Sequence, residues 1–121
     1  MSKIRIKTTL KAKDSIHTYE GKGILNNNQL IYNDNGIITK ITLDSPLTIE
    51  RTKDYKIKLG FKTNEIVKGT YIINEGIIET ITNTKELKLE KNSIKIKYNL
   101  KINNVNIDDF EFILTYTIDS M

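Results

Sequence analysis

The chain has 121 residues, of which 38% are hydrophobic and 28% are charged, and its formal net charge is +4. This length suits one domain, and this balance supports one hydrophobic core. The absence of cysteine excludes disulfides, thiolate metal sites and a cysteine nucleophile. The mild positive charge permits an acidic partner without requiring one. Because Ile and Thr are abundant while Ala and Pro each occur once, the composition favours strands over helices.

The start of the chain does not read as a targeting segment. From Met1 to Arg5 charged and apolar residues alternate, and no apolar h-region follows. No apolar run approaches the ~20 residues of a membrane-spanning helix. We therefore expect a cytoplasmic protein that does not associate with a membrane.

The first predicted strand, residues 3–13, alternates between an apolar and a basic face, which is typical of a strand with one side toward water. The second, residues 16–25, contains Gly21 and Gly23, and glycines inside a strand predict a bulge or a sharp bend. Turns rich in Asn follow, because Asn tolerates left-handed backbone angles. The next strands are predicted at residues 29–32, 37–43, 47–52 and 55–62.

The second half continues this pattern. The predicted strands cover residues 65–73, 77–84, a short and weaker 87–89, 94–102 and 109–118. About ten strands, most with one apolar face, are typical of an all-β sandwich or barrel, and closure removes exposed edges. We predict one antiparallel barrel domain of about 8–10 strands over residues 1–121, closed or nearly closed.

Side chains suited to catalysis are few. His17 is the only histidine, lies at a polar strand start beside Asp14, and is most simply a solvated imidazole. One histidine without cysteine does not supply a usual zinc site. The acidic cluster at residues 108–111 alternates with phenylalanines, which places its carboxylates outward. Because no nucleophile, base and oxyanion site can be assembled, we expect no enzyme, no cofactor and no metal.

Basic residues follow the outward faces of three predicted strands, and we call these rows the lysine ladders. If the barrel joined two ladders, the patch would suit a phosphate backbone, with Tyr19 or Tyr32 stacking on a base. The alternative is that the lysines only solubilise the chain and protect strand edges. Nucleic-acid binding is therefore the less favoured prediction. The candidate residues for it are Lys3, Arg5, Lys7, Lys11, Lys56, Lys58, Lys95 and Lys97.

Arg51 is the sharper candidate. It follows Leu47 and Ile49 at a period of two, so strand geometry directs it toward the core. Arginine is almost never fully buried unless it is paired. An inward arginine in a small barrel can hold a ligand carboxylate or phosphate, or it can be a structural arginine at the barrel mouth. Its candidate polar partners inside the barrel are Tyr55, Tyr71, Tyr98 and Tyr116.

Three local patterns have a counterpart in a known family. Arg51 ends a middle strand and Phe61 follows ten residues later; residues 71–76 begin with Tyr and end with Gly; residues 98–104 form a Tyr-x-Leu hairpin. In these patterns the chain resembles, over almost its whole length, the YwiB-like family of small bacterial proteins, a domain family of unknown function. The family's Thr-Pro is absent from residues 71–76, which puts a shared site there in doubt.

The resemblance implies a calycin-like barrel, related in shape to lipocalins and fatty-acid-binding proteins, which bind small apolar ligands internally. Fold alone does not transfer that activity. Our first hypothesis is a non-enzymatic binding barrel in which Arg51 and tyrosines fix the anionic group of a small amphipathic ligand. The alternative is a surface module that binds RNA or protein through the lysine ladders around a purely structural core. Both suit a monomer or a homodimer.

Overall fold

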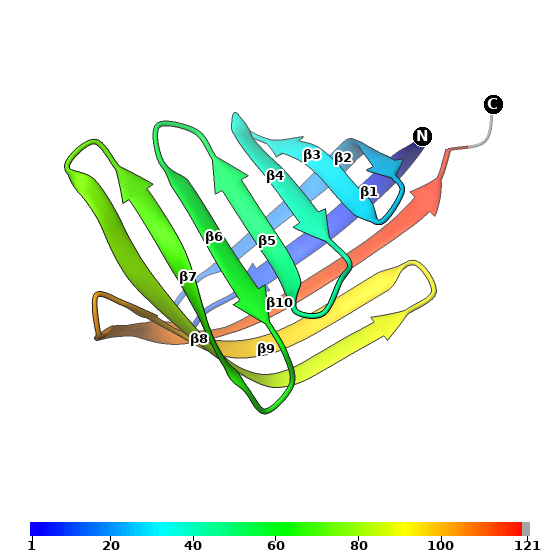
Figure 1. Ribbon diagram of the computed structural model, residues 1–121. Helices are drawn as coiled ribbons and strands as arrows, with labels where there is room; N and C mark the ends of the chain where they lie inside the picture. The colour runs from blue at the N-terminus through cyan, green and yellow to red at the C-terminus, as the bar shows by residue number, and fades with distance from the viewer. Residues whose placement is uncertain (120–121) are drawn as a thin grey trace.

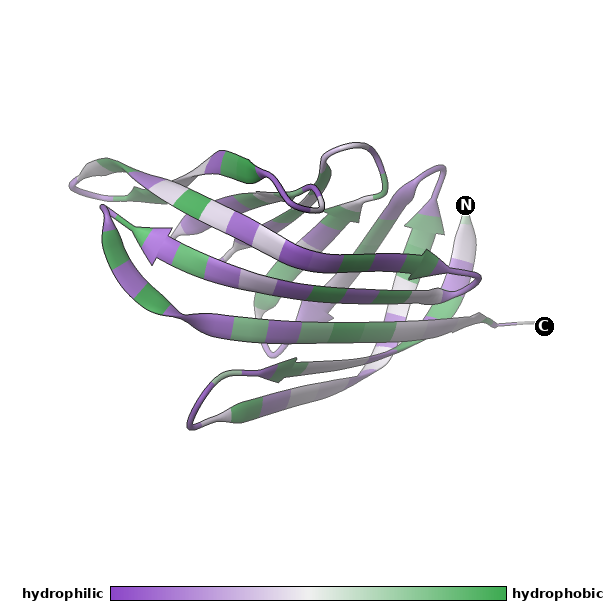
Figure 2. Ribbon diagram, turned by 90° about the horizontal axis from the view of Figure 1, so that it is seen from below, coloured by the Kyte–Doolittle hydropathy of each residue, from purple (hydrophilic) through white to green (hydrophobic). Residues whose placement is uncertain are grey.

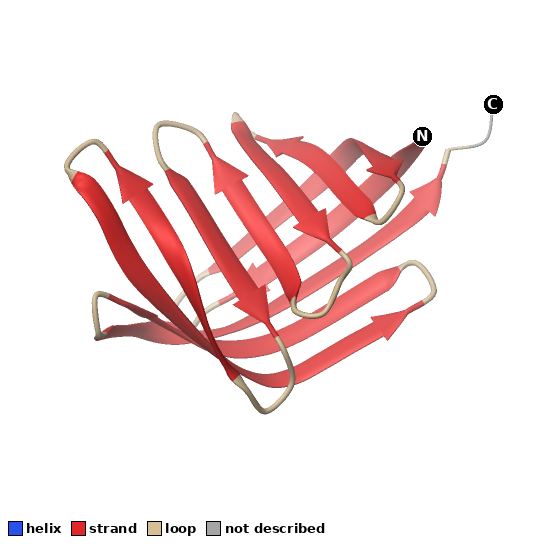
Figure 3. Cartoon of the chain, in the orientation of Figure 1, coloured by secondary structure: helices blue, strands red, loops and turns tan. Residues whose placement is uncertain are grey.

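The computed structural model describes residues 1–119, which form strands and short loops (Figure 1 and Figure 3). Ten antiparallel strands close a barrel in the order β1-β10-β9-β8-β7-β6-β5-β4-β3-β2. The strands are β1 (Ser2–Lys11), β2 (Ile16–Asn26), β3 (Gln29–Asp34), β4 (Ile37–Thr42), β5 (Leu47–Thr52), β6 (Lys56–Phe61), β7 (Ile66–Ile73), β8 (Gly76–Glu90), β9 (Ser93–Ile102) and β10 (Val105–Ile118). The predicted closed all-β barrel is confirmed.

The alternation of polar and apolar residues explains this architecture, and Figure 2 shows it along the strands. In β9, for example, Ile94, Ile96, Tyr98 and Leu100 are buried, while the residues between them are less so. The turns fall where Asn was expected: Asn27, Asn35, Asn64, Asn92, Asn103 and Asn104 all have positive φ. Local sequence therefore sets both the strand faces and most of the strand ends.

The barrel places its core between two crossing groups of strands. In Figure 1 strands β3 to β7 run across the direction of β9, β10 and β1 behind them, and β8 bends from the first group into the second. Closure is completed because β1 pairs with β2 on one side and with β10 on the other. The buried apolar core comes from both groups and includes Ile6, Leu30, Ile41, Leu47, Phe61, Ile96, Phe112 and Leu114.

Several strand predictions need correction, among them the last, because β10 begins at Val105 rather than at residue 109. The segments 77–84 and 87–89 are one strand, β8, which a register shift between Thr84 and Glu86 bends without ending it. The β1–β2 register runs through Gly21 and Gly23 with no bulge. Gly23 is instead needed for close packing, because a Cβ there would lie 2.8 Å from the Ile31 carbonyl oxygen. Strand β3 also continues past residue 32 to Asp34.

Strands β6 and β7 are joined by a short ladder of three residue pairs, Lys56 to Lys58 with Ile72 to Thr70. Beyond it β7 separates from β6, and the Thr82 hydroxyl of β8 donates to the carbonyl oxygen of Gly60. Gly69 packs so closely on β6 that the carbonyl oxygen of Lys58 occupies the space where a Cβ on residue 69 would lie.

Candidate functional site

Arg51 lies on the inner face of β5, as the alternation predicts. Its register partners are the buried Thr39 on β4 and the half-buried Ile57 on β6. Directly opposed residues in an antiparallel sheet point to the same side. Arg51 is itself half-buried. The sheet therefore holds a guanidinium at the edge of the apolar core.

Among the described residues, no carboxylate neutralises this guanidinium at short range. Within residues 1–119, no Asp or Glu oxygen lies within 4.0 Å of Arg51, although twelve other cation–carboxylate contacts meet that limit. Removing a charge from water is costly unless the charge is paired. Arg51 is thus a charged donor with capacity left for an anion.

Two cavities flank Arg51, and both are bordered by Leu10. The first, which we call the polar cavity, has about 220 Å³ and is lined by Leu10, His17, Asp34, Ile37, Thr39 and Arg51. The second, the apolar cavity, has about 240 Å³ and is lined by Leu10, Ile49, Arg51, Ile57, Leu59, Tyr98, Leu100 and Phe110. The two names refer to the lining residues, because four of the six around the polar cavity are polar or charged and only two of the eight around the apolar cavity are. A charge that borders both sets of residues suits an amphipathic molecule.

The polar cavity contains a pair that sequence reasoning missed. His17 Nε2 lies 2.8 Å from Asp34 Oδ2, so the imidazole has a partner on the neighbouring strand β3 rather than only solvent. Asp34 is 8% exposed, and its Oδ1 atom is buried without a hydrogen-bond partner within residues 1–119. The sequence did contain a pattern that places Asp34 on the inner face, because it follows Leu30 and Tyr32 at a period of two. A turn was predicted at this position instead.

Two buried tyrosines lie close enough to Arg51 for its charge to affect them. Burial raises the pKa of Tyr98 to about 12, and the positive charge of Arg51 opposes this rise. Burial likewise raises the pKa of Tyr32 to about 12, again with Arg51 acting in the opposite direction. Both hydroxyls therefore stay protonated at neutral pH. Phe110 stacks on Tyr98 with ring centroids 5.3 Å apart and extends the apolar wall.

The tyrosine pKa values predict an alkaline loss of stability. The unfolded chain releases phenolic protons near pH 10, while folded Tyr32 and Tyr98 hold theirs to about 12. The folded state binds more protons in this window, so the free energy of unfolding falls as pH rises, by on the order of 2 kcal/mol per tyrosine. Urea unfolding at several pH values should show this slope, and the double variant Y32F/Y98F should flatten it. An unchanged slope in the variant would contradict the assignment.

Of the four tyrosines predicted to partner Arg51, only Tyr98 lines a cavity with it. Tyr55 and Tyr71 make an edge contact with each other, with ring centroids 5.8 Å apart. Tyr116 pairs with Ile6 on the inner face of β1 and β10 and lies outside both cavity linings. Facing inward therefore does not by itself bring a tyrosine to Arg51, because it does not specify position along the barrel axis.

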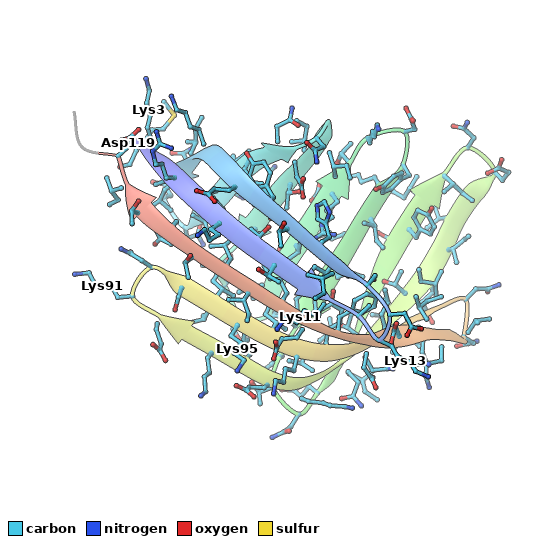
Figure 4. All side chains as sticks on the ribbon, turned by 180° about the vertical axis from the view of Figure 1, so that it is seen from behind. Lys3, Lys11, Lys13, Lys91, Lys95 and Asp119 are labelled. Atoms are coloured by element: carbon cyan, nitrogen blue, oxygen red, sulfur yellow. The ribbon has the colours of Figure 1, made fainter. Side chains whose placement is uncertain are left out.

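The lysine ladders are interrupted by carboxylates. Lys11, Glu111, Lys97 and Glu86 occupy one row across β1, β10, β9 and β8, so the charges alternate. Figure 4 shows Lys11 and Lys95 on this outer face. Lys7, Lys56 and Lys95 also have carboxylate partners. Within residues 1–119, Lys3, Arg5 and Lys58 have none within 4.0 Å. Tyr32 is buried, so base stacking on it is ruled out, and Tyr19 stacks on Tyr32 instead.

A larger groove of about 640 Å³ lies near the chain ends, over β1 to β4. Its lining includes Ile24, Ile31 and Ile38 together with Lys3 and Lys22. It lacks what distinguishes the Arg51 cavities, namely an unpaired inward charge beside a buried polar atom without a partner. We therefore place the candidate site at Arg51 despite the greater size of this groove.

The described residues contain no group of three His, Cys, Asp or Glu side chains arranged to hold a metal ion. None of their secondary-structure elements is a helix of the length and hydropathy needed to cross a membrane.

Comparison with known proteins identifies a family and a solved structure that shares the fold. A family described as a domain of unknown function (DUF1934) matches residues 3–114. The crystal structure of the ywiB protein from Bacillus subtilis shares the fold, with a TM-score of 0.66, 16% identity and coverage of 98% of this chain and 91% of that chain. No curated protein matches. Together these likenesses confirm the resemblance predicted from the sequence, and with it the calycin-like barrel.

Proposed function

This chain belongs to the family of the domain of unknown function DUF1934, and from its geometry we propose that it is a non-enzymatic barrel that binds a small amphipathic acid. The observation that carries the proposal is the inward Arg51, which has no ion-pair partner within residues 1–119 and lies between a polar and an apolar cavity. A barrel of this size can either fill its interior or hold one small ligand. The two cavities support the second case.

The chemistry of binding follows from the cavity walls. The guanidinium offers several N–H donors to an acidic group, and a charge-assisted hydrogen bond contributes about 1.5–3 kcal/mol. Tyr98, whose hydroxyl stays protonated, lines the apolar cavity together with Arg51, Phe110 and five aliphatic residues. The cavity volume of about 240 Å³ accommodates about eight groups of the size of a water molecule, at ~30 Å³ each. A chain such as that of decanoate is therefore a suitable probe.

Replacing Arg51 with methionine should weaken decanoate binding by about 10- to 100-fold, because the charged donor is lost while the apolar volume is nearly kept. Isothermal titration calorimetry on the intact barrel measures this directly. Arg5→Met is the matched control, since Arg5 is the only other arginine and is exposed on the outer face of β1. It removes the same charge and should leave the affinity unchanged.

Two outcomes would contradict the proposal. The proposed ligand site is contradicted if wild-type protein binds neither decanoate nor shorter and longer acids. Equal losses in Arg51→Met and Arg5→Met would assign binding to general surface charge. The surface-module alternative predicts the opposite ranking, with RNA binding weakened by Arg5→Met and retained by Arg51→Met. The alternating charges of the lysine ladders make that ranking the less expected one.

A further inference from the structure

The Oδ1 atom of Asp34 is the feature that an acid alone leaves unexplained. Asp34 ends β3 on the inner face, and its other oxygen, Oδ2, is held by His17 at 2.8 Å. Oδ1 is buried and has no partner within the described chain. Leaving a buried charged acceptor unsatisfied costs more than a typical hydrogen bond contributes. An occupant of the polar cavity that donates to Oδ1 would remove this cost.

The charges around the polar cavity also restrict its occupant. The charged and titratable groups in its lining are Arg51, Asp34 and His17; the other lining residues, Leu10, Ile37 and Thr39, are uncharged. Arg51 and Asp34 line the same space but are not within 4.0 Å of each other. A purely anionic head group gains from Arg51 and is repelled by Asp34. A head group carrying both charges satisfies both residues.

We infer that the polar cavity takes a zwitterionic head group, whose ammonium donates to Asp34 Oδ1 while its acidic group accepts from Arg51. The ligand class is an α-amino acid with a long apolar side chain, which lies in the apolar cavity on the other side of Arg51. His17 has a positioning role, because its contact holds the Oδ2 atom of the carboxylate, whose Oδ1 atom is the one without a partner within the described residues. This inference rests on the proposed function and names its ligand.

Three probes with the same chain length separate the contributions: decanoate, α-aminodecanoate and decylammonium. Wild-type protein should bind α-aminodecanoate at least tenfold more tightly than either of the others, as measured by titration calorimetry. Asp34→Asn removes the charge and keeps the side-chain shape. It should abolish the preference for α-aminodecanoate over decanoate, while decanoate binds as well as before or more tightly. Arg51→Met should weaken both acids, while decylammonium binds as well as before or more tightly because a repelling charge is removed.

The outcomes distinguish this inference from the proposed function. If wild-type protein binds decanoate as tightly as α-aminodecanoate, the zwitterion inference is wrong and the acid-binding barrel stands. If the preference survives in Asp34→Asn, Asp34 is not the ammonium partner and the inference is again wrong. If neither acid binds wild-type protein, both proposals fail. The comparison of probes on wild-type protein decides the matter even if Asp34→Asn fails to fold.

Discussion

Replacing Gly69 with alanine should destabilise the barrel by about 3 kcal/mol or more, at the upper end of what overpacking costs. A Cβ at this position would overlap the carbonyl oxygen of Lys58 and lie 2.6 Å from the Thr80 hydroxyl. The Lys58 carbonyl is part of the backbone of β6, so it can move away from the new Cβ only if β6 and β7 separate. These strands share only three residue pairs, and Lys58 belongs to one of them. Urea unfolding followed by circular dichroism measures the loss.

Gly21→Ala is the matched control for this prediction. Gly21 is also a strand glycine, but a Cβ there would meet the hydroxyl end of the Tyr19 side chain, which can rotate away. Alanine also restricts the unfolded chain, which offsets part of the cost. We expect a change within about 1 kcal/mol at Gly21. Similar losses for both variants would show that the contact with the Lys58 carbonyl is not what requires glycine.

Replacing Phe61 with alanine should lower the free energy of unfolding by about 3–5 kcal/mol. Phe61 is 0% exposed and contacts Tyr98 edge-on, with ring centroids 4.7 Å apart. Its removal costs the transfer of the ring and leaves a cavity in a core that strand pairing holds in place. Chemical denaturation is again the measurement, and Phe61→Leu should recover part of the loss because it fills part of the volume.

The control for Phe61 is Ile77, which is 70% exposed at the start of β8. Its replacement by alanine should change stability by less than about 0.5 kcal/mol, because little surface is removed from water in the folded state. Phe61 also bears on the site, because it supports Tyr98, which in turn lines the apolar cavity with Arg51. We therefore expect Phe61→Leu to alter decanoate affinity while Ile77→Ala leaves it unchanged. A loss at Ile77 equal to that at Phe61 would be incompatible with this core.

The sequence by itself determined the strand faces, the turns and the orientation of Arg51. These properties are local, because side chains alternate along a strand and Asn adopts positive φ in tight turns without help from distant residues. The same rule would have revealed Asp34, had β3 been extended by one more alternating pair beyond Tyr32. That error had a physical source, since Asp34 lies at the edge of a strong Asn-Gly turn signal.

Only the tertiary structure decided which inward residues meet. His17 lies on β2 and Asp34 on β3, and the pairing of these strands ends at Gly23 and Tyr32. The contact between His17 and Asp34 depends on how the two strands diverge beyond that last pair. The same holds for the tyrosines: periodicity turns Tyr71, Tyr98 and Tyr116 inward, but register and closure put only Tyr98 beside Arg51. Register between strands and closure of the barrel depend on contacts between residues far apart in the chain. Alternation along each strand therefore identified the charge inside the barrel, and the closed sheet determined its neighbours.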